Sequence, residues 1–269
     1  MAYDTNTPGI ITHMSNTKRR YSFDPKNYKT EMVGIVQDLR KLSSKRRKIE
    51  KHVNKILKKY PKDGNKLFSK DHLVAGLKFV ESEKILDSFS SEELHEILND
   101  IKMKPMRTQS GVTTVTVLTK PAPCPGKCIF CPNDVRMPKS YIATEPGAQR
   151  ALANRFSPYL QMWNRLKALK NIGHPTQKIE VLVLGVTWSS YPEKYQVWFV
   201  HELFRAMNDF EERKKQTDDT YTQVREYLKK DINDDIREEE GDLPYNKLIR
   251  TETFQKKFNE FIAPEEEAT

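Results

Sequence analysis

The stretch that decides the fold is GVTTVTVLT at residues 111–119, and the loop CPGKCIFC at residues 124–131 follows it closely. The first segment is β-branched at most positions and too short for a helix, so we expect a strand buried on both faces. KIEVLVLG at residues 178–185 predicts a second buried strand. Helices are expected at 140–172, with a restart at Ser157-Pro158, and at 193–207. The order strand, helix, strand, helix is typical of parallel α/β construction.

Amphipathic helices are expected upstream of this α/β segment. Apolar residues recur at three- and four-residue steps over 28–60 and predict one long helix, which Pro61 ends. A second helix is expected over 69–80. A third begins after Ser90, where Ser90 and Glu93 form a capping box.

The charge of the chain is unevenly distributed. The net charge of +9 divides into +16 over residues 1–200 and −7 over 201–269. A basic body of this size indicates a polyanionic partner, with nucleic acid first among the candidates. The predicted long helix carries a cationic ridge, which is either a solvated face or a contact for backbone phosphates. Its residues are Lys41, Lys45, Lys48, Lys55 and Lys59, with Arg40, Arg46 and Arg47 beside them. Acidic neighbours are few, so we expect little internal neutralisation.

Composition excludes some classes of protein. Hydrophobic residues make up 37% and charged residues 31% of the 269 residues, and apolar runs stay far below the roughly 20 residues that a membrane span requires. The first residues show no secretory signal, so we expect a cytoplasmic protein without a membrane partner.

The cysteines indicate a metal site. Cys124, Cys128 and Cys131 follow the spacing C-x3-C-x2-C, which is not a secreted disulfide framework. Three thiolates of one loop suit three irons of a [4Fe–4S] cluster and leave the fourth iron open to S-adenosylmethionine. The alternative is structural zinc, which requires a fourth ligand such as the distant His174 or His95. Inert buried cysteines fit a Pro-Gly loop poorly.

Further short motifs flank the loop. They are Arg107-Thr-x-Ser110-Gly111, LTKPAPCPGKCIFCP at 118–132, Tyr141-x-x-x-Glu145-Pro146, Gln149-Arg150-Ala151, Arg155-Phe-x-Pro158-Tyr-Leu160-Gln161, Gly173-His174 and Leu184-Gly185-x-Thr187-Trp-Ser-Ser-Tyr191-Pro192. The loop, with Phe130 before its last cysteine, resembles the radical S-adenosylmethionine motif. The motifs in this order resemble the Elongator catalytic subunit family over about residues 69–210.

This resemblance implies a fold and an activity. Members of the family have an N-terminal helical tRNA-binding domain, a partial TIM-like barrel with the cluster and a C-terminal acetyltransferase domain. They modify the wobble uridine of tRNA. A 5′-deoxyadenosyl radical takes hydrogen from the methyl group of an acetyl donor derived from acetyl-CoA, and the product carries a carboxymethyl group. Other Elongator-like subunits or a companion chain are implied partners.

The resemblance also implies site residues. Cys124, Cys128 and Cys131 would ligate the cluster, Gly185 and Thr187 would bind S-adenosylmethionine, and Lys178 would contact acetyl-CoA. Val186 departs from the Gly-Gly-Thr that is usual in the family. The predicted tRNA contacts are Lys41, Lys45, Arg46, Arg47, Lys48, Lys55 and Arg107. No catalytic acid, base or nucleophile is assigned.

The expected fold class is therefore α/β, a helical tRNA-binding domain followed by the first βα units of a radical S-adenosylmethionine barrel and a charged helical tail. The expected regions are a flexible basic arm at 1–27, the helical domain at 28–103, the incomplete barrel at 104–210 and a charged insertion or tail at 211–269. A barrel of this kind needs about six strand–helix units and the chain has two. We therefore expect a fragment, a split gene or a remnant. The alternatives in function are a non-catalytic RNA-binding remnant and a structural zinc module.

Overall fold

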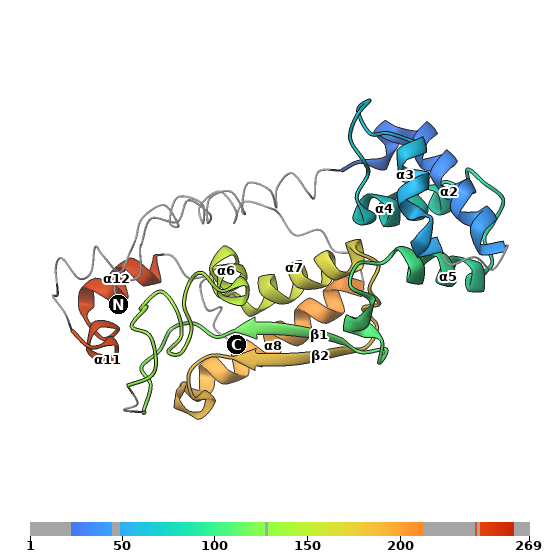
Figure 1. Cartoon of the computed structure of the whole chain (residues 1–269). Coiled ribbons are helices and arrows are strands. Elements are labelled where there is room, and N and C mark those ends of the chain that lie inside the picture. Colours follow the sequence, from blue (N-terminus) through green and yellow to red (C-terminus); the bar gives the residue numbers. More distant parts are fainter. Residues whose placement is uncertain (1–22, 45–48, 127–128, 212–239, 241–242, 261–269) are drawn as a thin grey trace. The chain divides into compact units, whose positions relative to one another are not determined.

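The computed structural model describes residues 23–44, 49–126, 129–211, 240 and 243–260 (Figure 1). Contacts between residues divide the chain into two units. Unit 1 holds the residues up to Thr113 together with Ala168–Lys178, and unit 2 holds Thr114–Lys167 and the residues from Ile179 onward. The helices of the described ranges all fall short of the length or hydrophobicity that a membrane crossing requires.

Unit 1 is helical, and its helices share one apolar core. Its described elements are the 3-10 turn η1 (Pro25–Tyr28), α2 (Lys29–Ser44), the 3-10 turn η2 (Ile49–Lys51), α3 (Val53–Lys59), α4 (Lys70–Ser82), α5 (Ser91–Ile101) and the 3-10 turn η3 (Pro105–Thr108). α2 and α4 contribute most of the buried side chains, and α3 and α5 close the core. The fully buried members include Met32, Ile35, Leu39, Leu73, Leu77, Ile97 and Ile101.

The predicted single helix over residues 28–60 is wrong. The chain forms a 3-10 turn at Ile49–Lys51, and α3 begins only at Val53. In one straight helix Lys59 and Asp38 would lie about 30 Å apart at 1.5 Å per residue. Instead Lys59 Nζ is 2.8 Å from Asp38 Oδ2, and the hydroxyl of Tyr60 also bonds that carboxylate. α3 therefore folds back against α2, because only then do its apolar residues reach the core that α2 faces.

The other two predicted helices of unit 1 are confirmed. α4 follows Ser69, whose backbone N–H donates to Nδ1 of His72 at 3.3 Å. α5 follows Ser90, whose hydroxyl accepts from the N–H of Glu93 at 3.1 Å. The carboxylate of Glu93 receives two bonds from Arg40 of α2. Glu93 thus takes part both in the cap of α5 and in the contact between α2 and α5.

Unit 2 is built on a two-stranded parallel sheet, in which β1 (Thr113–Leu118) pairs with β2 (Ile179–Leu184) (Figure 1). β1 is largely buried, as predicted. The prediction that β2 is buried on both faces is wrong, because Leu182 and Val183 point to opposite faces and are 44% and 40% exposed. An apolar strand with this exposure lacks the cover that a parallel sheet normally has.

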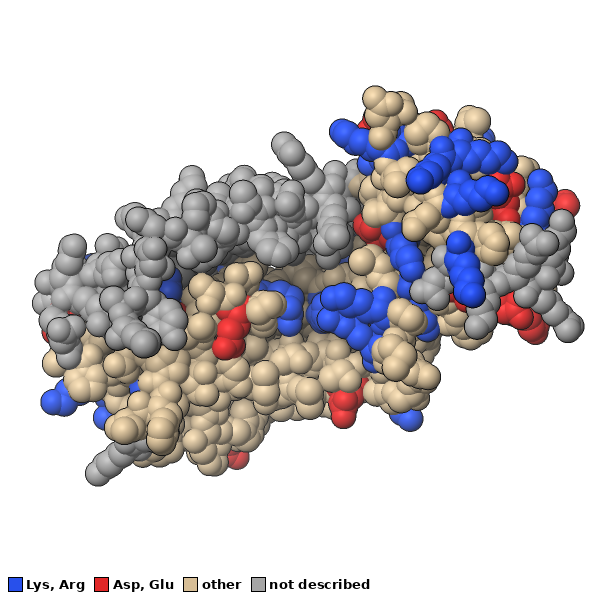
Figure 2. Space-filling view, in the orientation of Figure 1, with Lys and Arg blue, Asp and Glu red and all other residues tan. Residues whose placement is uncertain are grey.

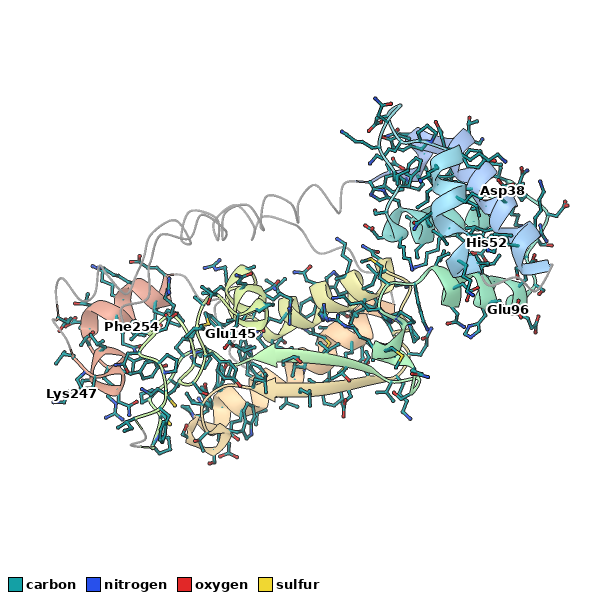
Figure 3. The ribbon with its side chains drawn as sticks, viewed as in Figure 1. Asp38, His52, Glu96, Glu145, Lys247 and Phe254 are labelled. Atoms are coloured by element: carbon teal, nitrogen blue, oxygen red, sulfur yellow. The ribbon has the colours of Figure 1, made fainter. Side chains whose placement is uncertain are left out.

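Helices follow both strands, as the α/β pattern predicts. α6 (Pro146–Ala153) and α7 (Pro158–Asn171) separate β1 from β2. The break between them falls before Pro158, where Arg155 and Phe156 adopt positive φ angles of 53° and 54°. The turn η4 (Trp188–Ser190) and α8 (Glu193–Glu211) follow β2, and α11 (Tyr245–Leu248) and α12 (Glu252–Asn259) end the described chain. Phe254 of α12 is buried (Figure 3).

α8 has apolar side chains on two sides. Tyr195, Phe199 and Leu203 are buried, whereas a second row is exposed. That row consists of Val197, Val200 and Phe204, which are 57%, 40% and 60% exposed. A helix that is apolar on two sides normally lies between two layers, whereas one apolar side of α8 is exposed to solvent.

This exposed row predicts how the isolated chain behaves. Phe204→Glu is expected to reduce self-association, measured by light scattering, and to change the free energy of unfolding by no more than about 0.5 kcal/mol. The matched control is Phe199→Glu on the buried side, which is expected to cost about 3 kcal/mol or more. Equal scattering from the wild type and Phe204→Glu would contradict the assignment.

Candidate functional site

The cysteine loop directly follows β1 in unit 2. Cys124 carries a free thiol, and Cys124 and Cys131 are both partly exposed. The N–H of Gly126 donates to Sγ of Cys124 at 3.4 Å. Cys128 lies outside the described residues. Two described thiols in an exposed loop, with a third cysteine between them in sequence, are a donor set that fits an iron–sulfur cluster.

The tip of this loop is apolar and exposed. Ile129 is 89% and Phe130 is 93% exposed. Large apolar side chains are usually buried in a folded chain, so this exposure is unusual. The loop therefore places exposed apolar side chains next to the cysteines.

The backbone leading into the loop is held by side chains of α7, of α8 and of the segment between η4 and α8. The amide of Gln161, on α7, accepts from the N–H of Leu118 and donates to its C=O, both at 2.9 Å. At Lys120, the N–H donates to the hydroxyl of Tyr195 at 3.0 Å and the C=O accepts from Tyr191 at 2.6 Å. Burial raises the pKa of the Tyr191 hydroxyl well above its usual range, so it stays a proton donor. The backbone at Leu118 and Lys120, just before the loop, is thus held in place by side chains.

The residues expected to bind cofactors lie at opposite ends of β2. Lys178 precedes the strand, is exposed, and its C=O accepts from the N–H of Thr113 at 2.9 Å. Gly185 and Thr187 follow the strand, and Thr187 is exposed. Val186 lies between them and is only 9% exposed, so its side chain packs against neighbouring residues. Gly185 and Thr187 lie at the same end of the sheet as the cysteine loop. The two strands are parallel, and each of these segments follows the carboxyl end of its strand.

Gly185 has a structural reason to be glycine. A Cβ at this position would collide with the hydroxyl of Thr119, the residue that follows β1. Thr119 is held in place by bonds to Tyr191 Oη at 2.7 Å and to the C=O of Leu184 at 3.3 Å. The glycine therefore permits the close approach of the two strand ends, whatever else it contacts.

The close contact between Gly185 and Thr119 predicts that substitutions at these two positions have non-additive effects on stability. Gly185→Ala is expected to destabilise unit 2 by about 1–3 kcal/mol through overpacking. Thr119→Ala removes the hydroxyl that the new Cβ meets, so the double variant is expected to lose less than the sum of the two single losses. Chemical denaturation of the four proteins measures the coupling. Additive losses would mean that the collision is relieved elsewhere.

His174 and His95 were the candidates for a fourth zinc ligand, and the structure places both among residues other than the cysteines. His174 is buried in unit 1, where its Nδ1 lies 2.9 Å from Oγ1 of Thr108. Gly173 before it has φ of +90°, and a Cβ there would lie 2.9 Å from Cβ of Lys102. His95 is exposed on α5. Among the described residues, which do not include Cys128, no three His, Cys, Asp or Glu side chains form a metal-binding group.

The predicted cationic ridge is rearranged and partly neutralised. Lys59 and Lys41 flank Asp38, at 2.8 and 3.8 Å, and Arg40 binds Glu93 at 2.9 Å (Figure 3 labels Asp38). The expectation that acidic neighbours are too few to pair with the ridge is therefore wrong for these residues, because α3 folds back against α2 and reaches Asp38. Four predicted tRNA contacts, Lys45, Arg46, Arg47 and Lys48, lie outside the described residues.

A different row of lysines faces outward. Lys51, Lys55 and Lys58 are exposed on one side of η2 and α3, opposite the buried Val53 and Ile56, and no acidic side chain of the described chain pairs with them. Lys55 was among the predicted tRNA contacts, whereas Lys51 and Lys58 were not. The apolar positions of α3 alone would have indicated this face. Figure 2 shows Lys and Arg side chains on the visible surface of this unit. Arg107 is also exposed, in η3.

Asp38 predicts a pH dependence of stability. Burial opposes ionisation of this carboxyl, but the bonds from Lys59 and Tyr60 outweigh it and hold its pKa below the ordinary 3.8. A folded-state pKa below the unfolded value stabilises the fold above pH 3.8, and the gain is lost as the pH falls through the folded-state pKa. Asp38→Asn is expected to flatten the loss of stability below about pH 4, measured by denaturation at several pH values. An unchanged profile would contradict this role.

Comparison with known proteins gives relatives for about half of the chain. No family model matches it. The tRNA uridine(34) acetyltransferase of Methanocaldococcus infernus is 40% identical over 144 residues, which is 51% of this chain and 27% of that protein. The protein of the same name from Dehalococcoides mccartyi is 43% identical over 102 residues, 38% of this chain and 22% of that protein. The human Elongator complex protein 3 is 35% identical over 123 residues, 42% of this chain and 22% of that protein.

The chain therefore spans about a quarter of the length of the curated relatives it matches. Both names belong to the family that the motifs indicate. The resemblance is thus confirmed, and over about half of its length this chain is related to the Elongator catalytic family.

Proposed function

We propose that this chain supplies the tRNA-contacting and cluster-binding portion of an enzyme that modifies uridine 34 of tRNA. The observation that carries the proposal is the C-x3-C-x2-C loop at the carboxyl end of β1, in a chain whose relatives are named tRNA uridine(34) acetyltransferase. The parallel sheet, the exposed loop tip and the outward lysines of α3 support it. Such an enzyme is expected to act in the cytoplasm.

The proposed ligands of a [4Fe–4S] cluster are Cys124, Cys128 and Cys131. When bound, a cluster with one open iron supplies the electron that cleaves S-adenosylmethionine. The backbone from Gly185 to Thr187 is proposed to bind that cofactor, because it leaves the sheet at the same end as the cysteine loop. Lys178 is proposed to contact acetyl-CoA, on the resemblance alone.

The complete reaction is proposed to need further elements. β2 has exposed apolar side chains and α8 has an uncovered apolar row, which is what an interrupted α/β barrel leaves. The missing strands and the acetyltransferase domain would come from further sequence or from a companion chain, and other Elongator-like subunits are proposed partners.

Anaerobic reconstitution with iron and sulfide tests the proposal. We expect about four irons per chain, a paramagnetic signal after reduction and reductive cleavage of S-adenosylmethionine. Binding of one zinc and no iron would replace the proposal with a structural zinc module. Binding of tRNA without cluster assembly would leave only an RNA-binding remnant.

A further inference from the structure

The short helix α11 contacts the backbone of the first cysteine. The N–H of Cys124 donates to Oδ1 of Asn246 at 3.0 Å, and Nδ2 of Asn246 donates to the C=O of Cys124 at 2.9 Å. A side-chain amide carries the same donor and acceptor as a peptide group. Asn246 therefore pairs with Cys124 as a neighbouring strand would, although the two residues are 122 positions apart.

The same arrangement occurs at the end of β1. Gln161 pairs through its amide with both backbone groups of Leu118 at 2.9 Å, and its side chain is buried. The segment that joins the strand to the first cysteine is thus held at both ends by a two-point amide bond. Two bonds to one residue fix its orientation as well as its position, which a single bond does not.

The residue before Asn246 holds the chain beyond the loop. Tyr245 is 1% exposed, and its hydroxyl donates to the C=O of Met137 at 2.8 Å. The ammonium group of Lys139 lies 4.7 Å from the centre of its ring. Consecutive residues of α11 therefore hold the backbone at the first cysteine, residue 124, and at residue 137, beyond the last cysteine.

We propose that Asn246 is a positioning residue for the cysteine loop, which fixes the backbone of Cys124 so that its thiol is presented before any metal binds. The inference rests on the proposed cluster for one of its readouts only. Pre-orientation lowers the entropy that must be lost when a loop closes around a metal. Without Asn246 the backbone of Cys124 loses both of these bonds, the one at its N–H and the one at its C=O.

Three variants of the full chain test this inference. Asn246→Ala removes both bonds, and Asn246→Asp keeps the acceptor for the N–H of Cys124 but loses the donor to its C=O. The matched control is Lys247→Ala, because Lys247 is the next residue of α11 and projects from the outer side of the helix (Figure 3). Thermal unfolding shows whether each variant is folded.

The first readout needs no metal. The rate at which a thiol reagent alkylates Cys124 in the apo-protein is followed on the tryptic peptide that ends at Lys127, in which Cys124 is the one cysteine. We expect the rate to rise several-fold in Asn246→Ala, less in Asn246→Asp, and not in Lys247→Ala. Equal rates in all variants, with unfolding temperatures unchanged, would overturn the inference. A rise in Lys247→Ala as large as in Asn246→Ala would also overturn it.

The second readout uses iron. After anaerobic reconstitution, Asn246→Ala is expected to hold less iron than the wild type and to lose it faster to a chelator, with a broadened signal after reduction. Lys247→Ala is expected to match the wild type. If the wild type itself takes up no iron, the proposed cluster fails, while the alkylation rates still decide the role of Asn246. If Asn246→Ala unfolds, Asn246→Asp supplies the comparison.

Discussion

Each of the substitutions Cys124→Ala, Cys128→Ala and Cys131→Ala is expected to abolish cluster assembly, lowering bound iron from about four per chain to below about one. The reason is the ligand count, because a cluster with an open iron has only three protein ligands and the loss of one leaves two. Iron analysis and the absorbance of the reconstituted protein measure the effect.

The control for these variants is Ile129→Ser, in the same loop. Ile129 is 89% exposed, so its replacement removes an apolar contact and leaves the thiols in place. This variant is expected to keep its iron. A cysteine variant that retains the full iron content and signal would exclude that cysteine as a ligand.

Reversing the charge of Lys51, Lys55 and Lys58 together, each to Glu, is expected to weaken tRNA binding about 100-fold at physiological salt. Each phosphate contact that a lysine makes releases counterions, so the slope of log affinity against log salt is expected to fall by about 2. Titration of tRNA at several salt concentrations measures both quantities.

The control for this variant carries the same change in net charge elsewhere. Lys194, Lys247 and Lys256 are exposed in unit 2, and their joint replacement by Glu is expected to cost less affinity. If both triple variants lose affinity equally, net charge alone governs binding. If the α3 variant binds as the wild type does, α3 is not a tRNA contact.

Several elements followed from local sequence patterns. The strand over 113–118, the cap at Ser90 and the restart at Pro158 each depend on neighbouring residues, and the structure has all three. The cysteine loop was likewise evident from its spacing, and the confirmed family resemblance came from short motifs within it and around it. These features were predictable because the residues that cause them are adjacent in the chain.

Other features were missed because distant residues decide them. Apolar periodicity continues from α2 into α3, so the sequence favoured one helix, whereas α3 folds back against α2 and brings Lys59 to Asp38. The prediction that β2 is buried was wrong because the strand lacks a covering layer among the described residues. Its β-branched and aliphatic residues are typical of a covered strand, and cover depends on a neighbouring layer that the described chain does not supply.

The amino-acid order by itself determined the two strands, the helices that begin after Ser90 and at Pro158, and the presence of three thiols in one loop. Only the tertiary structure decided that Asp38 pairs with Lys59, that Gly185 meets Thr119, and that Asn246 holds Cys124. The physical reason is that periodicity and capping act over a few residues, whereas these contacts join positions from 21 to 122 apart. Their formation depends on the path of the chain between them.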